Sequence, residues 1–456
     1  MSKKNGHHKT ISSFSSLTQF LEKGCKEKKD WMIGTEHEKF GYIKETLKPL
    51  PYDGTPSITS ILMGLKDRYG WKPLTENGNL VGLKKKGAQV TLEPGGQLEL
   101  SGAPLDSIHA TCAEASRHLK EVKSVAEKIG VGFIGLGASP DWRHNEMPRM
   151  PKQRYKLMSD YMTKVGKYGH QMMYRTCTIQ VNLDFSSEKD MIKKFRTALA
   201  LQPIATALFA NSPIFEGKLV HHKSWRSRIW RDLDKSRTGM LPFVFEDGMS
   251  FEKYADYALD VPMYFVRRRG KYINALGQSF RDFMNGKLPA LPGELPLVSD
   301  WEDHLTTLFP EVRLKQFLEM RGADGGPWNR ICALPALWVG LLYDETALNA
   351  AWDLCCRWTA EERENLLITA SRKGLSGSVG KILIKDVALE MIKISRLGLK
   401  ARAKPSDSFN LEDESHFLDI LEDFVERSQS PADELISKFN LSEVKNFYSI
   451  YNEYSY

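Results

Sequence analysis

The sequence predicts an α+β fold, because extended and helical segments follow one another irregularly and then give way to helices. Extended segments with apolar and polar residues on opposite faces occur throughout the first three quarters of the chain, at 31–43, 89–102, 175–185 and 312–322. Helical segments lie between them, at 58–70, 104–128 and 193–209. After Leu334 the pattern is mostly helical. We therefore expect an α+β body, 1–345, with a helical portion, 346–456, packed on it as one structural unit.

The first elements are a helix over 15–28, the apolar strand 31–43 and a helix over 58–70. Within 89–102 the sequence Glu-Pro-Gly-Gly separates two extended pieces and predicts a tight turn. The long helix 104–128 carries an apolar stripe at helical spacing.

The segment 175–185 alternates most regularly, with Ile179 on its apolar face and Gln180 on its polar face. That polar face is open to water or lines a wet site. The next helix, 193–209, is expected to be interrupted at Pro203. The polar stretch 404–416 is a candidate linker.

Composition sets limits on function. An apolar share of 41% and a charged share of 27% are typical of a soluble globular protein. The net charge of +7 has no dominant basic block, which favours small anionic ligands as readily as nucleic acid. Because Lys and Arg are not clustered among aromatic residues, we expect no nucleic-acid partner. The longest apolar stretches are shorter than a bilayer span, and no secretory signal is visible, so we expect no membrane partner and a cytoplasmic location. Six cysteines without Cys-x-x-Cys spacing indicate a reducing compartment.

Acidic side chains gather on three predicted strands, at two-residue spacing or beside the glycine-rich turn; they are Glu36, Glu38, Glu93, Glu99 and Glu319. Side chains two apart on a strand share a face, so Glu36 and Glu38 repel each other unless a cation lies between them. Magnesium prefers such oxygen ligands, and Gln180 can join as a neutral donor. Taken singly, these residues also fit solvated strand positions. Together they predict a magnesium site.

Arginines occur near the same segments; they are Arg154, Arg175, Arg226, Arg228, Arg237 and Arg321. A guanidinium binds carboxylate or phosphate through paired hydrogen bonds, so these arginines can hold an anionic substrate beside metal ions. Each alone also fits a surface ion pair. The segment from Gly374 departs from a phosphate-binding loop, and no Gly-x-Ser-x-Gly or His-Glu-x-x-His motif is present.

Motifs including IGTEHEKFGY, LEPGGQLELSGAPL, MPKQRYKLMSDYM, RTCTIQVNLDFSS and EMRGADGGPW follow one another in order between about residues 21 and 362. Together they resemble plant-type glutamate–cysteine ligase, which many bacteria also carry, and we interpret the chain as a bacterial member. The resemblance implies a curved, largely antiparallel sheet forming a funnel with outer helices, similar to the glutamine synthetase catalytic domain. It also implies ATP- and Mg²⁺-dependent joining of the glutamate γ-carboxylate to the cysteine amine through a γ-glutamyl phosphate, the first step of glutathione biosynthesis.

The resemblance also assigns residues. It implies that the metal ligands are Glu36, Glu38, Glu93, Glu99, Gln180 and Glu319. Glu38 and Arg321 would act in catalysis, with Arg321 facing the transferred phosphate or the glutamate. Arg154 and Arg226 would bind the amino-acid carboxylates, and Arg237 the nucleotide. The substrates would be glutamate, cysteine and ATP, for a monomer or weak homodimer.

One departure from plant members concerns cysteine. Ala275 and Ala290 stand where the plant regulatory pair is found, so that disulfide cannot form. A second plant pair has counterparts in Cys112 and Cys332, and bonding depends on their separation. Two alternatives remain. A related carboxylate–amine ligase would share the metal site and use a different amine. A basic polyanion-binding protein would show clustered Lys and Arg among aromatics, which this sequence lacks.

Overall fold

A sheet of nine strands forms the centre of the computed structural model, which describes residues 9–405, 411–441 and 447–456. The strand order is β14-β15-β7-β1-β5-β4-β3-β2, and β6 pairs with β1 beside this path. Every neighbouring pair in it is antiparallel. The strands are β1 (Ile33–Ile43), β2 (Lys72–Glu76), β3 (Asn79–Lys85), β4 (Ala88–Leu92), β5 (Leu98–Ser101), β6 (Val131–Ile134), β7 (Thr178–Leu183), β14 (Val312–Leu314) and β15 (Leu318–Asp324). The predicted α+β class with a largely antiparallel sheet is confirmed.

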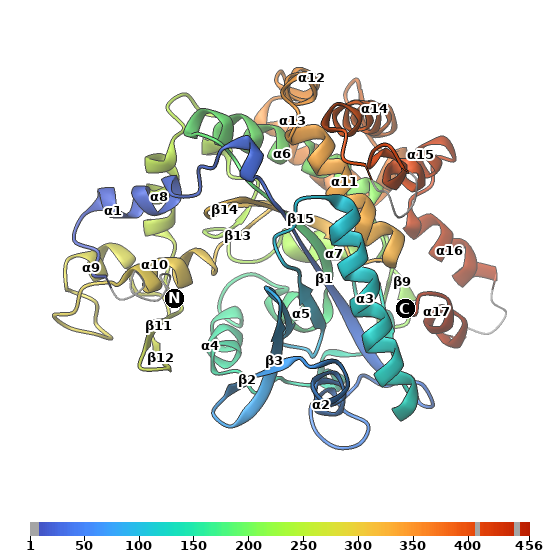
Figure 1. The fold of residues 1–456 in the computed structure, drawn as a ribbon, viewed down its shortest axis with the longest axis horizontal. Coiled ribbons are helices and arrows are strands. Elements are labelled where there is room, and N and C mark those ends of the chain that lie inside the picture. Colours follow the sequence, from blue (N-terminus) through green and yellow to red (C-terminus); the bar gives the residue numbers. More distant parts are fainter. Residues whose placement is uncertain (1–8, 406–410, 442–446) are drawn as a thin grey trace.

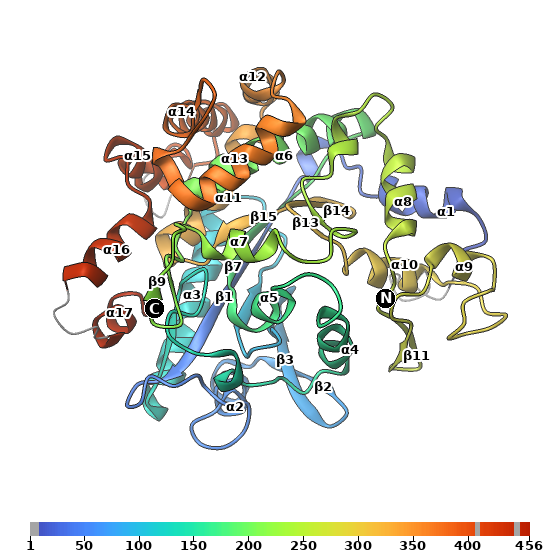
Figure 2. The same ribbon diagram turned by 180° about the vertical axis from the view of Figure 1, so that it is seen from behind.

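Helices surround this sheet (Figure 1). Those of the first 345 residues are α1 (Phe14–Glu22), α2 (Ile58–Tyr69), α3 (Ile108–Ala126), α4 (Gln153–Met162), α5 (Gly169–Arg175), α6 (Glu188–Leu208), α7 (Trp225–Trp230), α8 (Phe251–Asp260), α9 (Phe280–Met284), α10 (Val298–Leu305) and α11 (Trp328–Leu342). Short two-stranded pairs lie among them: β8 (Ile214–Phe215) with β9 (Lys218–Leu219), β10 (Thr238–Gly239) with β13 (Phe309–Pro310), and β11 (Phe265–Arg268) with β12 (Lys271–Asn274). The view from behind shows α5 and α7 over β1 and β7 (Figure 2).

The C-terminal part is helical apart from the small pair β16 (Ser378–Val379) and β17 (Ile382–Leu383). Its helices are α12 (Glu345–Cys355), α13 (Ala360–Lys373), α14 (Ile384–Arg402), α15 (Asp419–Glu426), α16 (Pro431–Leu441) and α17 (Phe447–Glu453). The helices α12, α13 and α14 pack on α6, and α14 also packs on α11. One apolar core therefore includes residues from both sides of residue 345. This packing supports the expected single unit, and we keep the division into 1–345 and 346–456 as a proposal.

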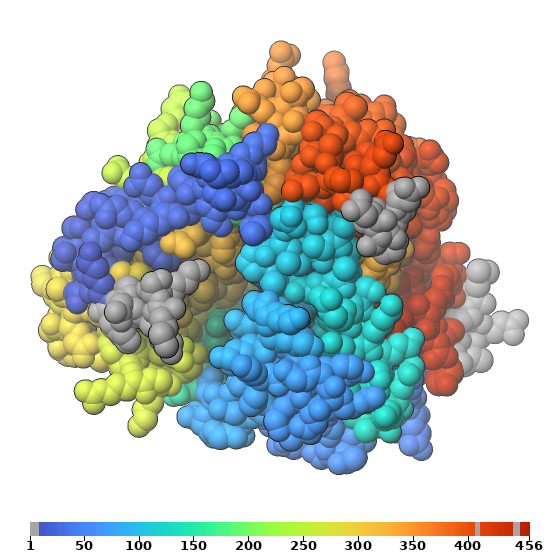
Figure 3. Space-filling view, in the orientation of Figure 1, coloured from blue at the N-terminus to red at the C-terminus, as the bar shows by residue number. Residues whose placement is uncertain are grey.

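Local sequence explains several element ends. The Ser57 and Ser107 hydroxyls accept the first-turn N–H groups of α2 and α3, and Gly70 ends α2 with a φ of +70°. The apolar face of β7, from Cys177 to Phe185, is fully buried against α11. Figure 3 shows α3, in teal, between the blue of β2 and β3 and the orange and red of the C-terminal helices.

Three boundaries differ from the predictions. Pro203 lies inside a continuous α6, because the buried surroundings of this helix outweigh the loss of one N–H donor. The strand expected over 312–322 is two strands, β14 and β15, paired as a hairpin. The first helix ends at Glu22, two residues before Gly24. Of the predicted linker 404–416, the segment 406–410 lies outside the described residues.

Cys112 on α3 and Cys332 on α11 form a disulfide, with Cα atoms 5.5 Å apart. The bond joins two helices that also pack together. Among the described residues no single helix is long and apolar enough for a membrane span; α11 and α12 pass that test only as a pair bent by 93°.

The crossing of α11 and α14 depends on Gly340 and Gly398. A Cβ on Gly340 would collide with the Ser395 carbonyl, and a Cβ on Gly398 would collide with the Gly340 carbonyl. We expect Gly340→Val to lower the free energy of unfolding by about 3 kcal/mol, the upper range for forcing extra atoms into a packed core. Chemical denaturation measures this loss. Leu397→Ala on the exposed side of α14 is the control, and equal stability of both variants would contradict the prediction.

Candidate active site on the antiparallel sheet

A cavity of about 280 Å³ lies over one face of the sheet, between the strand ends and α4, α5 and α7. Its walls include several of the predicted site residues, namely Glu38, Glu93, Glu99, Arg154, Arg226 and Arg321. Segments from five distant parts of the sequence supply these side chains. The structure therefore brings most of the predicted site together.

Strand register explains this convergence. Glu38 on β1 lies directly opposite Glu99 on β5, and Glu36 lies opposite Gln180 on β7. Glu319 on β15 lies opposite Asn182, two residues further along β7. Residues opposite each other across an antiparallel pair point to the same face, so the predicted carboxylates of these strands share one side of the sheet.

Glu38, Glu93 and Glu99 form the acidic group inside the cavity. Glu38 accepts the Thr178 N–H at 2.9 Å. Glu99 accepts the hydroxyls of Ser101 and Thr91 at 2.8 and 3.0 Å. Burial and the charges of Glu93 and Glu99 raise the pKa of Glu38 well above its usual range. Burial and the charge of Glu93 raise the pKa of Glu99 as well. The protein cations near Glu38 and Glu99 are therefore too few to balance the negative charge of these carboxylates when they are ionised.

Glu36 and Glu319 form a second acidic group beside the first. Glu36 accepts the amides of Asn182 and Gln180 at 2.9 and 3.3 Å. Burial, Glu319 and Glu99 raise the pKa of Glu36 to about 7. Glu319 differs, because cations surround it.

Arg313 makes two bonds of 2.7 and 2.8 Å to the Glu319 carboxylate through Nη2, Lys315 lies 3.2 Å away, and Arg321 also pairs with it. Burial would raise the pKa of Glu319, but these three charges hold it well below its usual range. In this structure the Glu319 carboxylate is thus already paired with protein cations.

The donor set fits a hard divalent cation, because the groups are carboxylate and amide oxygens without sulfur or imidazole. Within the described ranges no three acidic, cysteine or histidine side chains already stand together as one metal cluster. Glu38, Glu93 and Glu99 are the residues best placed to hold a cation that also contacts a substrate. Glu36 and Gln180 lie directly beside them.

Two arginines on the cavity wall are linked by a hydrogen bond from one to the backbone of the other. Arg226 donates to the Arg321 carbonyl at 2.7 Å, and Arg321 donates to Gln180 Oε1 at 2.6 Å. Both guanidinium groups lie near the Trp230 ring, with Cζ 5.4 and 5.8 Å from its centroid. Arg154 lies 5.8 Å from the Tyr155 ring, and its Nε has no partner in the described structure.

Arg237 does not line the cavity. It is fully buried and donates to Asp234 at 2.7 Å, to the Thr307 carbonyl at 3.1 Å and to the Pro262 carbonyl at 2.6 Å. Every nitrogen of its guanidinium is therefore bonded to protein. This geometry gives Arg237 a role in holding loops together and does not support the predicted nucleotide contact.

Several cavity residues were missed by the sequence reasoning. Lys152 donates to the Leu92 carbonyl at 2.9 Å and to the Tyr155 hydroxyl at 3.2 Å. That hydroxyl also lies 3.1 Å from Glu93. Lys152 and Tyr155 are one helical turn apart in the same motif as Arg154, so their shared face was the available signal. Arg313 and Lys315 lacked such a signal, because only the β14–β15 hairpin brings them to Glu319.

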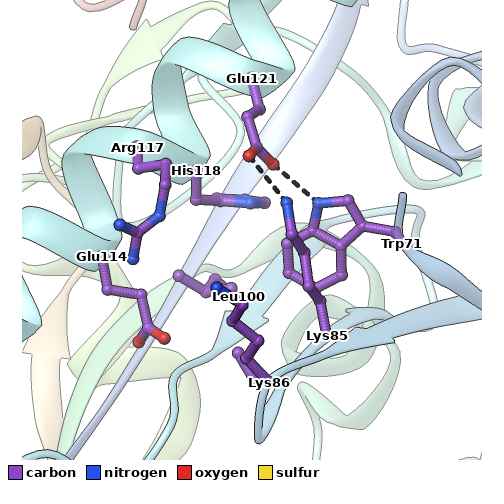
Figure 4. Close-up of a pocket in the computed structure, with 9 residues that line it drawn as sticks. Trp71, Lys85, Lys86, Leu100, Glu114, Arg117, His118 and Glu121 are labelled. Atoms are coloured by element: carbon purple, nitrogen blue, oxygen red, sulfur yellow. Dashed lines mark hydrogen bonds and ion pairs between the residues drawn. The ribbon is translucent and has the colours of Figure 1, made fainter. Parts of the chain in front are cut away.

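A second cavity of about 180 Å³ lies on the other face of β5, between α3 and the β3–β4 hairpin. The Glu121 carboxylate accepts the Trp71 indole N–H at 2.7 Å and the Lys85 ammonium at 3.1 Å (Figure 4). None of the predicted site residues lines it.

Comparison with solved structures defines the type of fold. The chain resembles the crystallised glutamate–cysteine ligase from Francisella tularensis in complex with AMP, with a TM-score of 0.54, 16% identity and coverage of 93% of this chain and 87% of that one. The chain thus shares the fold of that protein, in which helices surround a largely antiparallel sheet.

Sequence comparison gives the family. The model of glutamate–cysteine ligase family 2 matches residues 32–449, and the chain belongs to this family of enzymes. It is 52% identical over 440 residues to the chloroplastic glutamate–cysteine ligase B of Oryza sativa subsp. japonica, covering 96% of this chain and 86% of that protein. It is 54% identical over 424 residues to the chloroplastic glutamate–cysteine ligase of Arabidopsis thaliana, covering 93% and 79%.

These relatives confirm the resemblance to plant-type glutamate–cysteine ligase and correct one expectation. The cytoplasmic location is contradicted, because the plant relatives are named chloroplastic proteins. A missing secretory signal says nothing about delivery to a plastid, so the earlier inference was wrong. The assignment as a bacterial member stays a prediction.

The raised pKa of Glu36 makes the stability of the metal-free protein depend on pH. Because folding raises this pKa from 4.5 to about 7, the folded state holds a proton that the unfolded state releases, and stability falls as pH rises through this window. We expect Glu36→Gln to raise the free energy of unfolding by about 3 kcal/mol at pH 8 and by less than about 1 kcal/mol at pH 5.

Denaturant unfolding with a chelator present, at both pH values, measures this difference. Glu45→Gln, an exposed glutamate just beyond the end of β1, is the matched control and should change stability at neither pH. An equal gain for Glu36→Gln at both pH values would contradict the assigned pKa.

Proposed function

We propose that the chain joins the γ-carboxylate of glutamate to the amine of cysteine at the expense of ATP, the first step of glutathione biosynthesis. Family membership supports this reaction. The observation that carries it is the cavity in which Glu38, Glu93 and Glu99 face Arg226 and Arg321. Acidic groups that hold a cation and arginines that hold an anion are what a phosphate donor and an acidic acceptor both require.

Magnesium is the proposed metal. Glu38, Glu93 and Glu99 would hold magnesium inside the cavity. Glu36 and Gln180, which lie next to them on the same face of the sheet, would add a second set of oxygen ligands. Glu319 would support this second set through Arg321, because its carboxylate is already paired. When bound, magnesium offsets the charge of the ATP phosphates and of the crowded carboxylates.

The arginines would orient the acidic substrate. Arg226 is 3% exposed and Arg321 is 9% exposed, so both charges are desolvated and bind an anion more strongly than surface arginines do. We assign Arg321 to the γ-carboxylate or the transferred phosphate, and Arg226 to an amino-acid carboxylate. Arg154, on α4, also lines the cavity and would bind the carboxylate of the other amino acid.

The reaction would proceed in two balanced steps. A γ-carboxylate oxygen of glutamate bonds to the terminal phosphorus of ATP, and ADP leaves. The cysteine amine then attacks the acyl carbon, the bond from that carbon to the phosphate oxygen breaks, and inorganic phosphate and a proton leave. The side chains described here bind and orient the reactants, and no covalent bond to the protein is needed.

ADP release tests the proposal. We expect ADP to form with ATP, magnesium, glutamate and cysteine together, with loss of activity when magnesium is chelated. Release with another amine but not with cysteine would favour the alternative ligase. If no amine leads to ADP release, the proposed ligase reaction is contradicted. The expected monomer or weak homodimer stays a prediction, which light scattering can test.

Glu38→Gln tests the acidic group directly. We expect kcat to fall by at least about a thousandfold, because a carboxylate facing the phosphate donor is lost. We also expect the variant to fold normally, because it removes charge from a group whose ionisation is already disfavoured. Steady-state ADP formation and thermal unfolding check the two parts. Full activity, or a variant that does not fold, would count against the role of Glu38.

A further inference from the structure

Arg226 is the second residue of α7, a helix of only six residues that packs on β15 (Figure 2). A helix of that length is not stable by itself, so contacts from outside it must fix its position. The guanidinium group of Arg226 is held at one end, because its Nη2 donates to the Arg321 carbonyl at 2.7 Å. The backbone end needs partners of its own, because the first N–H groups of a helix have none within the helix.

Two buried serines supply these partners at the start of α7. The Ser212 hydroxyl oxygen accepts the Arg226 N–H at 3.1 Å, and the Ser224 hydroxyl oxygen accepts the Ser227 N–H at 3.1 Å. Ser212 is 2% exposed and Ser224 is fully buried. Each hydroxyl also has a proton to donate, so its orientation depends on the group that accepts this proton.

The carboxylate of Asp324, at the end of β15, accepts both serine protons. Its Oδ2 accepts the Ser212 hydroxyl at 2.7 Å and the Asn211 N–H at 2.8 Å. Its Oδ1 accepts the Ser224 hydroxyl at 2.7 Å. A Cβ on Gly137 would overlap this carboxylate, so the glycine leaves room for it. Asp324 is buried and does not line the catalytic cavity, so it acts on a substrate only through the residues that it holds.

The charge of Asp324 strengthens this network. Burial raises the pKa of the Asp324 carboxyl, and the charge of Arg226 and the three hydrogen bonds act against that rise. Hydrogen bonds to an ionised acceptor are stronger than those between neutral groups. β15 therefore fixes Arg226 at both ends. The Arg321 carbonyl holds its guanidinium group, and the Asp324 carboxylate, three residues further on, holds its backbone through Ser212.

We propose that Asp324 is a positioning residue for glutamate, which sets the start of α7 through Ser212 and Ser224 and so directs the Arg226 guanidinium into the cavity. The assignment of Arg226 to a carboxylate of glutamate rests on the proposed function. Without these hydrogen bonds the start of α7 can shift, so glutamate binds more weakly. ATP, held by the carboxylates and their cation, binds as before.

Asp324→Asn in the full chain tests the proposal. The amide nitrogen cannot accept a hydroxyl proton, so at least one of the three donors to Asp324 loses its acceptor. We expect the KM for glutamate to rise at least about fivefold, with kcat and the KM for ATP changed by less than about threefold. Ser212→Ala removes the acceptor of the Arg226 N–H and should raise the KM for glutamate at least about threefold. Steady-state ADP formation at varied glutamate, cysteine and ATP measures these constants.

Two matched controls separate positioning from general loss of stability. Asp184 is a buried aspartate just beyond the end of β7, which accepts the Met32 N–H at 2.8 Å and the Lys26 ammonium at 2.7 Å. Ser395 is a buried serine on α14 that donates to the Leu337 carbonyl at 3.0 Å. We expect Asp184→Asn and Ser395→Ala to change the KM for glutamate by less than about twofold, even where they lower the thermal unfolding temperature.

A rise of less than about fivefold in the KM for glutamate of Asp324→Asn would overturn the proposal. An equal rise in the KM for ATP, or an equal rise for glutamate in Asp184→Asn, would also overturn it, because either result indicates general disruption. If Asp324→Asn does not fold, Ser212→Ala decides: a rise of at least about threefold supports the proposal, and a smaller one overturns it. A wild-type chain that releases no ADP with glutamate and cysteine would instead overturn the proposed function.

Discussion

The register of β1 between β5 and β7 is the constraint on which the rest of the site depends. It sets Glu38 opposite Glu99 and Glu36 opposite Gln180. The side-chain oxygens of β1, β5 and β7 therefore lie on one face of the sheet. A slip of one residue would send all of them to the other side of the sheet. The apolar partners of this register, buried against α6 and α11, supply the free energy that holds the crowded carboxylates in place.

The two acidic groups are balanced in different ways, and this difference organises the site. Glu319 is neutralised by protein cations and fixes Arg321, whereas Glu38, Glu93 and Glu99 lack enough positive partners. Protein charges therefore position the arginines, and we propose that an exchangeable cation balances the carboxylates of the cavity. That division would suit the proposed ligase reaction, because the arginines would stay in place through turnover while a metal could enter with the phosphate donor.

The sequence allowed prediction of most elements and of the glutamates of the cavity, because two-residue spacing puts Glu36 and Glu38 on one face wherever the strand lies. Family resemblance assigned Arg226 and Arg321, which the cavity brings together. It also assigned Arg237, whose hydrogen-bond partners at Asp234, Thr307 and Pro262 come from separate loops and are invisible to local pattern. Pairing of Glu319 with Arg313 depends on a hairpin in a segment that spacing alone describes as one strand.

Magnesium binding to the full chain, measured by isothermal titration calorimetry, tests the central claim that the carboxylates facing the cavity form a cation site. The account predicts saturable binding to the wild-type chain and at least about a tenfold loss of affinity when Glu38 and Glu99 are both changed to Gln, with little change when the exposed Glu45 is changed. Equal affinity in all three proteins would contradict it.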